Sequence, residues 1–163
     1  TALWRNVVSE VGRSYPDVSL NHMYVDNAAM QLMSKPRQFD TILTSNLFGD
    51  ILSDIAGIIV GSIGMIPSGS MGDSIGLYEP SHGTAPKMVG LDSANPIGAI
   101  LAVGMMFRYS LGLDQADELI RTAVKQTIVT YRTRDIMAPG KQQVGCTEMG
   151  DHILEQVSIG ARK

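Results

Sequence analysis

The sequence predicts an α/β fold with two lobes, residues 1–62 and residues 63–163. Two observations support this prediction. Up to about residue 60, apolar residues alternate between helical spacing and short β-branched runs, as they do where helices cover a sheet. Glycine, serine and proline are then dense as far as Pro86, after which helical spacing returns. No long flexible linker separates the lobes, so we expect them to pack together.

The elements of the first lobe follow from spacing and from the residues that end each segment. Leu3, Val7 and Val11 recur at helical spacing, and the Pro16-Asp17 pair ends that helix. The β-branched residues of the DTILTS stretch indicate a buried strand. The further predictions for this lobe are a strand over 18–25, a helix over 26–33, the buried strand over 40–45 and a helix over 47–60.

Turn residues and helix caps divide the second lobe. Two short apolar runs between glycines predict small strands at 64–66 and 76–78. Asn95 is expected as an N-cap, with Pro96 as the first residue of a helix that runs to about Gly112. The next predicted helix has Asp114 as its N-cap and runs to about Tyr131. The last predicted helix runs from Thr147 to Val157.

Composition excludes two classes of partner. The chain has 163 residues, with Lys+Arg 13 against Asp+Glu 16, for a net charge of −3. This balance argues against the broad cationic surface that binds nucleic acid through its phosphates. The longest apolar stretches, 55–66 and 96–107, are shorter than the roughly 20 residues that a membrane span needs. We therefore expect neither nucleic acid nor a membrane as a partner.

Two further features concern the compartment in which we expect the protein and how much of it this sequence represents. Cys146 is its single cysteine, which fits a reducing compartment, and the expected location is cytoplasmic. The sequence opens at Thr1 without an initiator methionine or a signal-type apolar block, and it reads as part of a longer protein.

Three aspartates have the character of metal ligands. Asp50 and Asp54 are four residues apart on a predicted helix, which places both carboxylates on one face. Two like charges there repel each other unless a cation such as Mg²⁺ or Mn²⁺ lies between them. The alternative is that both are ordinary acids near a helix N-terminus, although their apolar neighbours would make unpartnered carboxylates costly. Asp26, at the end of a predicted strand, is the third candidate, and its alternative is a helix N-cap.

A polar loop from Glu79 to Lys87 is the candidate nucleotide site. It is punctuated by Gly83 and bracketed by prolines, so its backbone amides can face phosphate oxygens. The sequence contains no G-x-G-x-x-G motif. The alternative is an ordinary surface connection in which His82 is a hydrogen-bonded structural histidine.

Three stretches carry a resemblance to a known family. They are VDNAAMQL at 25–32, NLFGDILSD at 46–54 with its continuation to Met65, and EPSHGTAP at 79–86. These stretches resemble the β-decarboxylating dehydrogenases, the family of isopropylmalate and isocitrate dehydrogenases, and the first of them resembles the isopropylmalate branch. The resemblance covers essentially the whole chain and corresponds to the C-terminal half of the family's two-lobe fold, which is not a Rossmann fold.

The resemblance implies a reaction and a set of site residues. A divalent ion, Mg²⁺ or Mn²⁺, would be held by Asp50 and Asp54, with Asp26 of the partner subunit, and would bind a 2-hydroxy dicarboxylate substrate. The implied reaction is the oxidative decarboxylation of 3-isopropylmalate with NAD, a step of leucine biosynthesis, in a homodimer. The implied cofactor-binding residues are Glu79, His82, Gly83, Thr84, Ala85, Pro86, Lys87, Met88 and Asn95.

Two departures from the family pattern modify this expectation. The family's acid–base Lys and Tyr lie upstream of the part that this chain represents, so we expect the chain alone to be inactive. Lys87 stands where NAD-preferring members carry Asp, which makes NADP a possible cofactor. The alternatives are an isocitrate-type or tartrate/malate-type dehydrogenase that uses NADP, and a non-catalytic nucleotide-binding subunit.

Overall fold

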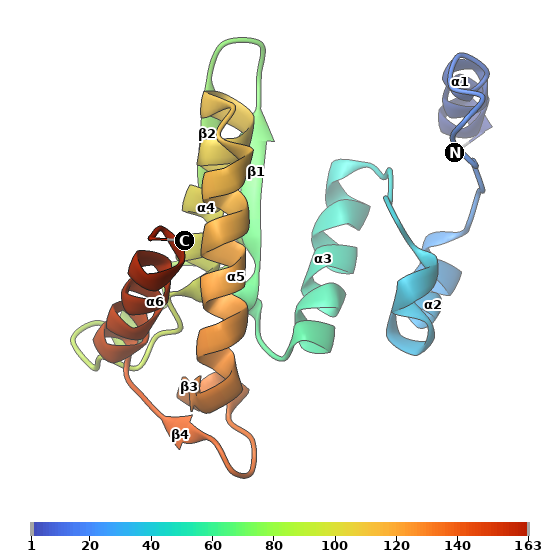
Figure 1. Ribbon diagram of the computed structural model, residues 1–163. Coiled ribbons are helices and arrows are strands. Elements are labelled where there is room, and N and C mark those ends of the chain that lie inside the picture. Colours follow the sequence, from blue (N-terminus) through green and yellow to red (C-terminus); the bar gives the residue numbers. More distant parts are fainter. Residues whose placement is uncertain (1, 163) are drawn as a thin grey trace. The chain divides into compact units, whose positions relative to one another are not determined.

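The computed structural model describes residues 2–162, and the chain divides into two compact units after Ile55 (Figure 1). The first unit is mainly helical, with long irregular connections. The second unit combines two small sheets with three long helices. The lobe boundary at residues 62 and 63 stays a prediction.

The structure confirms the helices that the spacing of apolar residues predicts for the first unit. The helices of this unit are α1 (Ala2–Gly12), α2 (Val25–Ser34), the short 3₁₀ helix η1 (Pro36–Gln38) and the first part of α3 (Asn46–Val60). Helix α1 ends before the turn that contains Pro16, as predicted. Its side chains are not buried, whereas α2 buries Ala28 and Leu32.

The two strands predicted for this unit are wrong. Residues 19–24 and 41–45 form neither strand nor helix. A strand needs a neighbour to satisfy its backbone N–H and C=O groups, and these segments pair with no strand in the described part of the chain. Leu43, expected in a buried strand, is 65% exposed.

In the second unit, an antiparallel hairpin follows the end of α3. Strand β1 (Pro67–Met71) pairs with β2 (Gly76–Pro80), and Gly69 lies opposite Tyr78. The predicted strand at 64–66 is displaced, because residues 63–65 form the 3₁₀ helix η2 (Ile63–Met65). Helix α4 (Ile97–Leu111) contacts both strands of the hairpin. It ends at Gly112, as predicted, with the left-handed φ of +65° that favours glycine.

Helices α5 (Asp114–Thr130) and α6 (Cys146–Gly160) complete the second unit. Helix α5 packs against both α4 and α6. Asp114 is the first residue of α5 and Leu113 precedes it as the N-cap, so the predicted cap is displaced by one position. A parallel pair of two-residue strands, β3 (Tyr131–Arg132) and β4 (Gln142–Gln143), was not predicted.

The hydrophobic core of the second unit lies where these three helices meet. Its buried members are Ile97, Ala123, Val124, Ile136, Val144, Met149 and Ile153. Two glycines let α4 approach its neighbours closely. A Cβ on Gly98 would lie 2.9 Å from the carbonyl oxygen of Gly64, and one on Gly104 would lie 2.7 Å from Oδ1 of the buried Asp117. None of the described helices is long and apolar enough to cross a membrane.

Candidate functional site

Helix α3 positions the two carboxylates that the sequence pairs. Asp50 and Asp54 are one helical turn apart and both are exposed. Oδ2 of Asp50 accepts a hydrogen bond from Nδ2 of Asn46 at 3.4 Å. The apolar neighbours do not bury the pair in this chain, since Leu47 is 65% and Ile51 47% exposed. Solvent therefore screens the repulsion between the carboxylates, and both remain accessible to a cation.

Asp26 lies in the first turn of α2, where its Oδ1 accepts a hydrogen bond from the backbone N–H of Asn27 at 2.7 Å. The N-cap of α2 is Tyr24, so the alternative interpretation of Asp26 as the N-cap is wrong. Among residues 2–162, no three His, Cys, Asp or Glu side chains are grouped closely enough to hold a metal ion. The expected metal site takes Asp26 from a second subunit, and its role stays a prediction.

The predicted nucleotide loop follows β2 and leads into α4. Its start is fixed by the backbone N–H of Ser81, which donates to the carbonyl oxygen of Ile66 at 3.0 Å. His82 is half-buried, and its Nδ1 lies 2.8 Å from the carbonyl oxygen of Gly83. From Gly83 to Leu91 every residue is exposed. The loop therefore offers backbone and side chains to a ligand over most of its length.

The middle of this loop is tightly turned. Ala85 has a left-handed φ of +43° and leads into the 3₁₀ helix η3 (Pro86–Met88), which contains the exposed Lys87. Nothing lies within 4 Å of a Cβ built on Gly83 or Gly90, so open space surrounds the backbone there. Exposed amides beside open space suit a phosphate-bearing ligand.

Asn95 ends the loop and lies two residues before the start of α4. It is only 8% exposed. Its Oδ1 accepts from the backbone N–H of Ile97 at 3.0 Å, and its Nδ2 donates to Oδ2 of Asp135 at 3.0 Å. The N-cap of α4 is Pro96 and the helix begins at Ile97, so the predicted cap and helix start are each displaced by one position. The side chain of Asn95 still accepts from the first N–H of the helix. The role of Asn95 toward a cofactor stays a prediction, as does that of Glu79, which is exposed on β2.

The carboxylate of Asp135 has a lowered pKa. Partial burial opposes ionisation, but hydrogen bonds outweigh it and lower the pKa below 3.8; the largest contribution is from Ser62, and Asn95 adds a smaller one. Asp135 is therefore ionised at neutral pH and holds the amide of Asn95 in place. No sequence pattern predicts this contact, since Asn95 and Asp135 are 40 residues apart.

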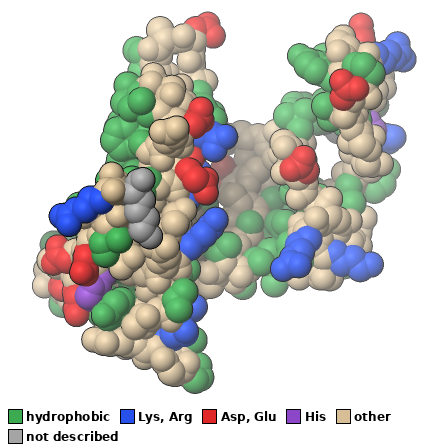
Figure 2. All heavy atoms as spheres, viewed as in Figure 1, with side chains coloured by type: hydrophobic (Ala, Val, Ile, Leu, Met, Phe, Trp, Pro, Cys, Tyr) green, Lys and Arg blue, Asp and Glu red, His purple; other side chains and the backbone are tan. Residues whose placement is uncertain are grey.

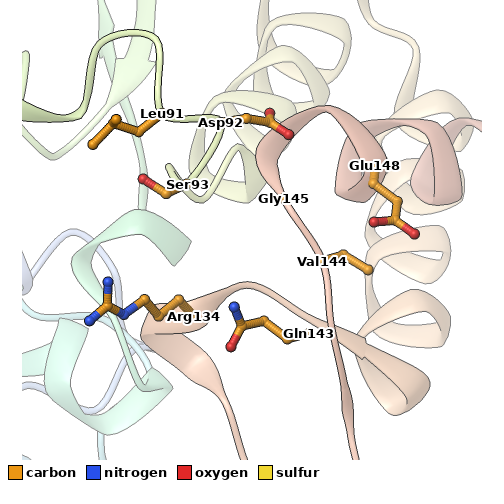
Figure 3. A pocket seen from close by; sticks show the side chains of 8 residues that line it. All are labelled: Leu91, Asp92, Ser93, Arg134, Gln143, Val144, Gly145 and Glu148. Atoms are coloured by element: carbon orange, nitrogen blue, oxygen red, sulfur yellow. The ribbon is translucent and has the colours of Figure 1, made fainter.

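A cavity of about 310 Å³ lies beside the end of the loop (Figure 3). Its lining comes from the loop, from the 3₁₀ helix η4 (Arg134–Ile136) and from the segment that runs from β4 into α6. The lining residues are Leu91, Asp92, Ser93, Arg134, Gln143, Val144, Gly145 and Glu148. Sequence reasoning did not single out Asp92, which binds Thr147, a residue 55 positions away. Only the fold brings these two residues together.

Comparison with known proteins identifies the class. The family model described as isocitrate/isopropylmalate dehydrogenase matches residues 1–153, and the chain belongs to this family. A 3-isopropylmalate dehydrogenase from Synechocystis is 56% identical over 154 residues, which cover 93% of this chain and 42% of that protein. The chain thus spans less than half the length of that curated relative.

Solved structures agree with the family assignment. An isocitrate dehydrogenase from Methylococcus capsulatus matches with a TM-score of 0.88 and 33% identity, covering 96% of this chain and 46% of that one. A β-decarboxylating dehydrogenase from Thermococcus kodakarensis matches with a TM-score of 0.84 and 38% identity, covering 97% of this chain and 46% of that one. The fold is therefore that of about half of such a dehydrogenase.

Proposed function

We propose that this chain supplies the metal-binding carboxylates and the cofactor loop of an enzyme that oxidatively decarboxylates 3-isopropylmalate with NAD. The observation that carries the proposal is the 56% identity to a 3-isopropylmalate dehydrogenase over 93% of the chain. The exposed Asp50–Asp54 pair and the exposed loop from Gly83 to Leu91 support it, because both remain available to ligands.

The donor set on α3 fits a hard divalent cation. Asp50 and Asp54 offer two carboxylates from one helical face, which leaves the remaining positions of Mg²⁺ or Mn²⁺ to substrate oxygens, water and Asp26 of the partner subunit. A bound ion of this kind acts as a Lewis acid toward the hydroxyl and carboxylate of a 2-hydroxy acid. The two aspartates would hold the ion on a rigid helix and so orient the substrate.

The loop of the second unit fits a dinucleotide. Its exposed turn around Ala85 and Pro86 would face the phosphates, and His82 and Asn95 would flank the adenosine half. Hydrogen bonds to Met65, Ile97 and Asp135 hold the side chain of Asn95, so its position is fixed before any ligand binds. A pre-ordered residue reduces the entropy that binding costs.

A homodimer is part of the same proposal. Helix α3 exposes a large apolar surface, including Ile58 at 68% and Phe48 at 43%. Exposed apolar helix faces of this kind are typical of protein–protein contacts, and a second subunit is what the proposed role of Asp26 requires.

The function is tested in the full-length protein, since the family's acid–base residues lie outside this chain. We expect NAD-linked turnover of 3-isopropylmalate that depends on Mn²⁺ or Mg²⁺. Asp54→Asn should lower kcat/KM by about 100-fold or more, because a ligand of the Lewis acid is lost. Exchange of Asp73, an exposed acid of the β1–β2 turn, for Asn serves as the control. The isolated chain should be inactive, and turnover by the chain alone would contradict this.

Lys87 favours a second candidate within the same class, an enzyme that accepts NADP. Its exposed ammonium can attract a 2′-phosphate, whereas a carboxylate would repel one and bind the ribose hydroxyls. Lys87→Asp should therefore raise the ratio of kcat/KM for NAD to that for NADP. An unchanged ratio would eliminate Lys87 as a determinant of cofactor choice.

A further inference from the structure

Asp92 joins the loop to the first turn of α6 (Figure 3). Its Oδ1 accepts two hydrogen bonds from Thr147, one from the backbone N–H and one from Oγ1, both at 2.8 Å. Its backbone carbonyl oxygen accepts a third from the N–H of Cys146 at 2.9 Å. One loop residue thus satisfies two backbone donors that a helix N-terminus otherwise leaves unpaired.

The backbone on both sides of this contact is adapted to it. Asp92 has a left-handed φ of +48°, a conformation that residues other than glycine adopt at a cost and that aspartate tolerates better than most. Gly145, just before α6, leaves no room for a side chain, since a Cβ there would lie 2.8 Å from the carbonyl oxygen of Asp92. The close approach therefore needs both a left-handed residue in the loop and a glycine beside the helix.

Few other hydrogen bonds described join the loop to the rest of the second unit. Ser81 fixes its start and Asn95 its end. Between Gly83 and Leu91, the backbone hydrogen bonds described are local, such as that from the N–H of Met88 to the carbonyl oxygen of Ala85. Among the hydrogen bonds described, those of Asp92 are therefore the nearest in sequence to Lys87 and Met88 that join the loop to a helix.

We infer that Asp92 is a positioning residue: by binding the first turn of α6, it holds the segment from Gly83 to Leu91 in the conformation that receives the dinucleotide. This inference rests on the proposed function of the loop. The hydrogen bonds from Thr147 lower the pKa of Asp92, so the contact is made by an ionised carboxylate at neutral pH. Negative charge at a helix N-terminus is stabilising.

Three variants test whether the carboxylate of Asp92, and not another acid beside the cavity, holds the loop. Asp92→Gly removes the carboxylate and also relieves the left-handed backbone. Asp92→Asn keeps an oxygen acceptor and the tolerance of that backbone but loses the charge. Glu148→Gln is the matched control, because Glu148 lines the same cavity and pairs with His152 at 3.7 Å instead of with the loop.

Two measurements are made on each variant: hydrogen exchange of the amides of Met88, Val89 and Leu91, whose N–H groups are hydrogen-bonded within the loop, and calorimetric titration with NAD⁺. We expect Asp92→Gly to speed exchange and weaken NAD⁺ binding, each by about tenfold or more, because bonds to a charged acceptor are lost. Asp92→Asn should restore part of both effects, and Glu148→Gln should change neither.

The outcomes distinguish this inference from the proposed function. An unchanged exchange rate in Asp92→Gly overturns the positioning role, whatever the NAD⁺ affinity of that variant. Faster exchange with unchanged NAD⁺ affinity also overturns it, because the loop would then bind without being held. Faster exchange in a chain whose unsubstituted form binds no NAD⁺ supports the Asp92 contact and counts against the proposed cofactor site.

Discussion

In the second unit, Ile97 and Met149 are completely enclosed, whereas α1 in the first unit buries none of its side chains. The second unit therefore contains its own hydrophobic core, built where α4, α5 and α6 meet. The first unit places apolar side chains at the surface instead, and hydrophobic side chains are visible on its exterior in Figure 2. A sequence that forms helices therefore does not by itself give each unit a hydrophobic core of its own. We expect the first unit to depend on additional contacts that the second does not need.

Substitution of core residues should give the largest difference between the units. Met149→Ala should lower the free energy of unfolding of the second unit by about 2–5 kcal/mol, since it opens a cavity among fully buried neighbours. The matched change in the first unit, Val11→Ala, should cost less than about 0.5 kcal/mol, because Val11 is 54% exposed. Urea unfolding followed by circular dichroism measures both. Equal effects would contradict the contrast between the units.

A buried ion pair should give an intermediate effect within the second unit. Asp117 is fully buried and accepts hydrogen bonds at 2.9 Å from Nε of Arg121. Arg121→Met should destabilise this unit by about 1–3 kcal/mol, because the buried carboxylate keeps only its bond at 3.3 Å from Arg108. Lys125→Met, an exposed change one turn along α5, is the control in the same denaturation experiment. If Arg121→Met destabilised the unit no more than the control does, the ion pair would not contribute to its stability.

The smallest expected effect is a dependence of stability on pH. The folded-state pKa of Asp135 is below its ordinary value of 3.8, so the ionised carboxylate stabilises the fold fully above that pH. The contribution is lost as the pH falls through the lowered pKa. Asp135→Asn should therefore flatten the loss of stability as the pH falls below about 4, by about 1 kcal/mol or less for a partly exposed group. Thermal unfolding across this range tests it, and an unchanged slope would count against the bond to Asn95.

The helices were predictable from the sequence because the spacing of their apolar residues is local, although the predicted caps Asn95 and Asp114 are each displaced by one position. Gly112 and Asn95 mark the two ends of α4 through their own backbone and side-chain chemistry. The strands over 18–25 and 40–45 were not, since a strand exists only with a partner and the described chain supplies none. The site divides in the same way. Asp50 and Asp54 follow from helical spacing, whereas the contact of Asp92 with Thr147 depends on the tertiary fold.

The central claim is that the exposed carboxylates of α3 bind the divalent ion of this dehydrogenase family. Paramagnetic broadening by Mn²⁺ in the ¹⁵N-labelled chain tests it most directly, because it detects weak binding and locates the ion. The account predicts that the amide signals of residues 46–58 broaden and that the double variant Asp50→Asn, Asp54→Asn abolishes this effect. Broadening that persists in the double variant, or that centres on other residues, would contradict the claim.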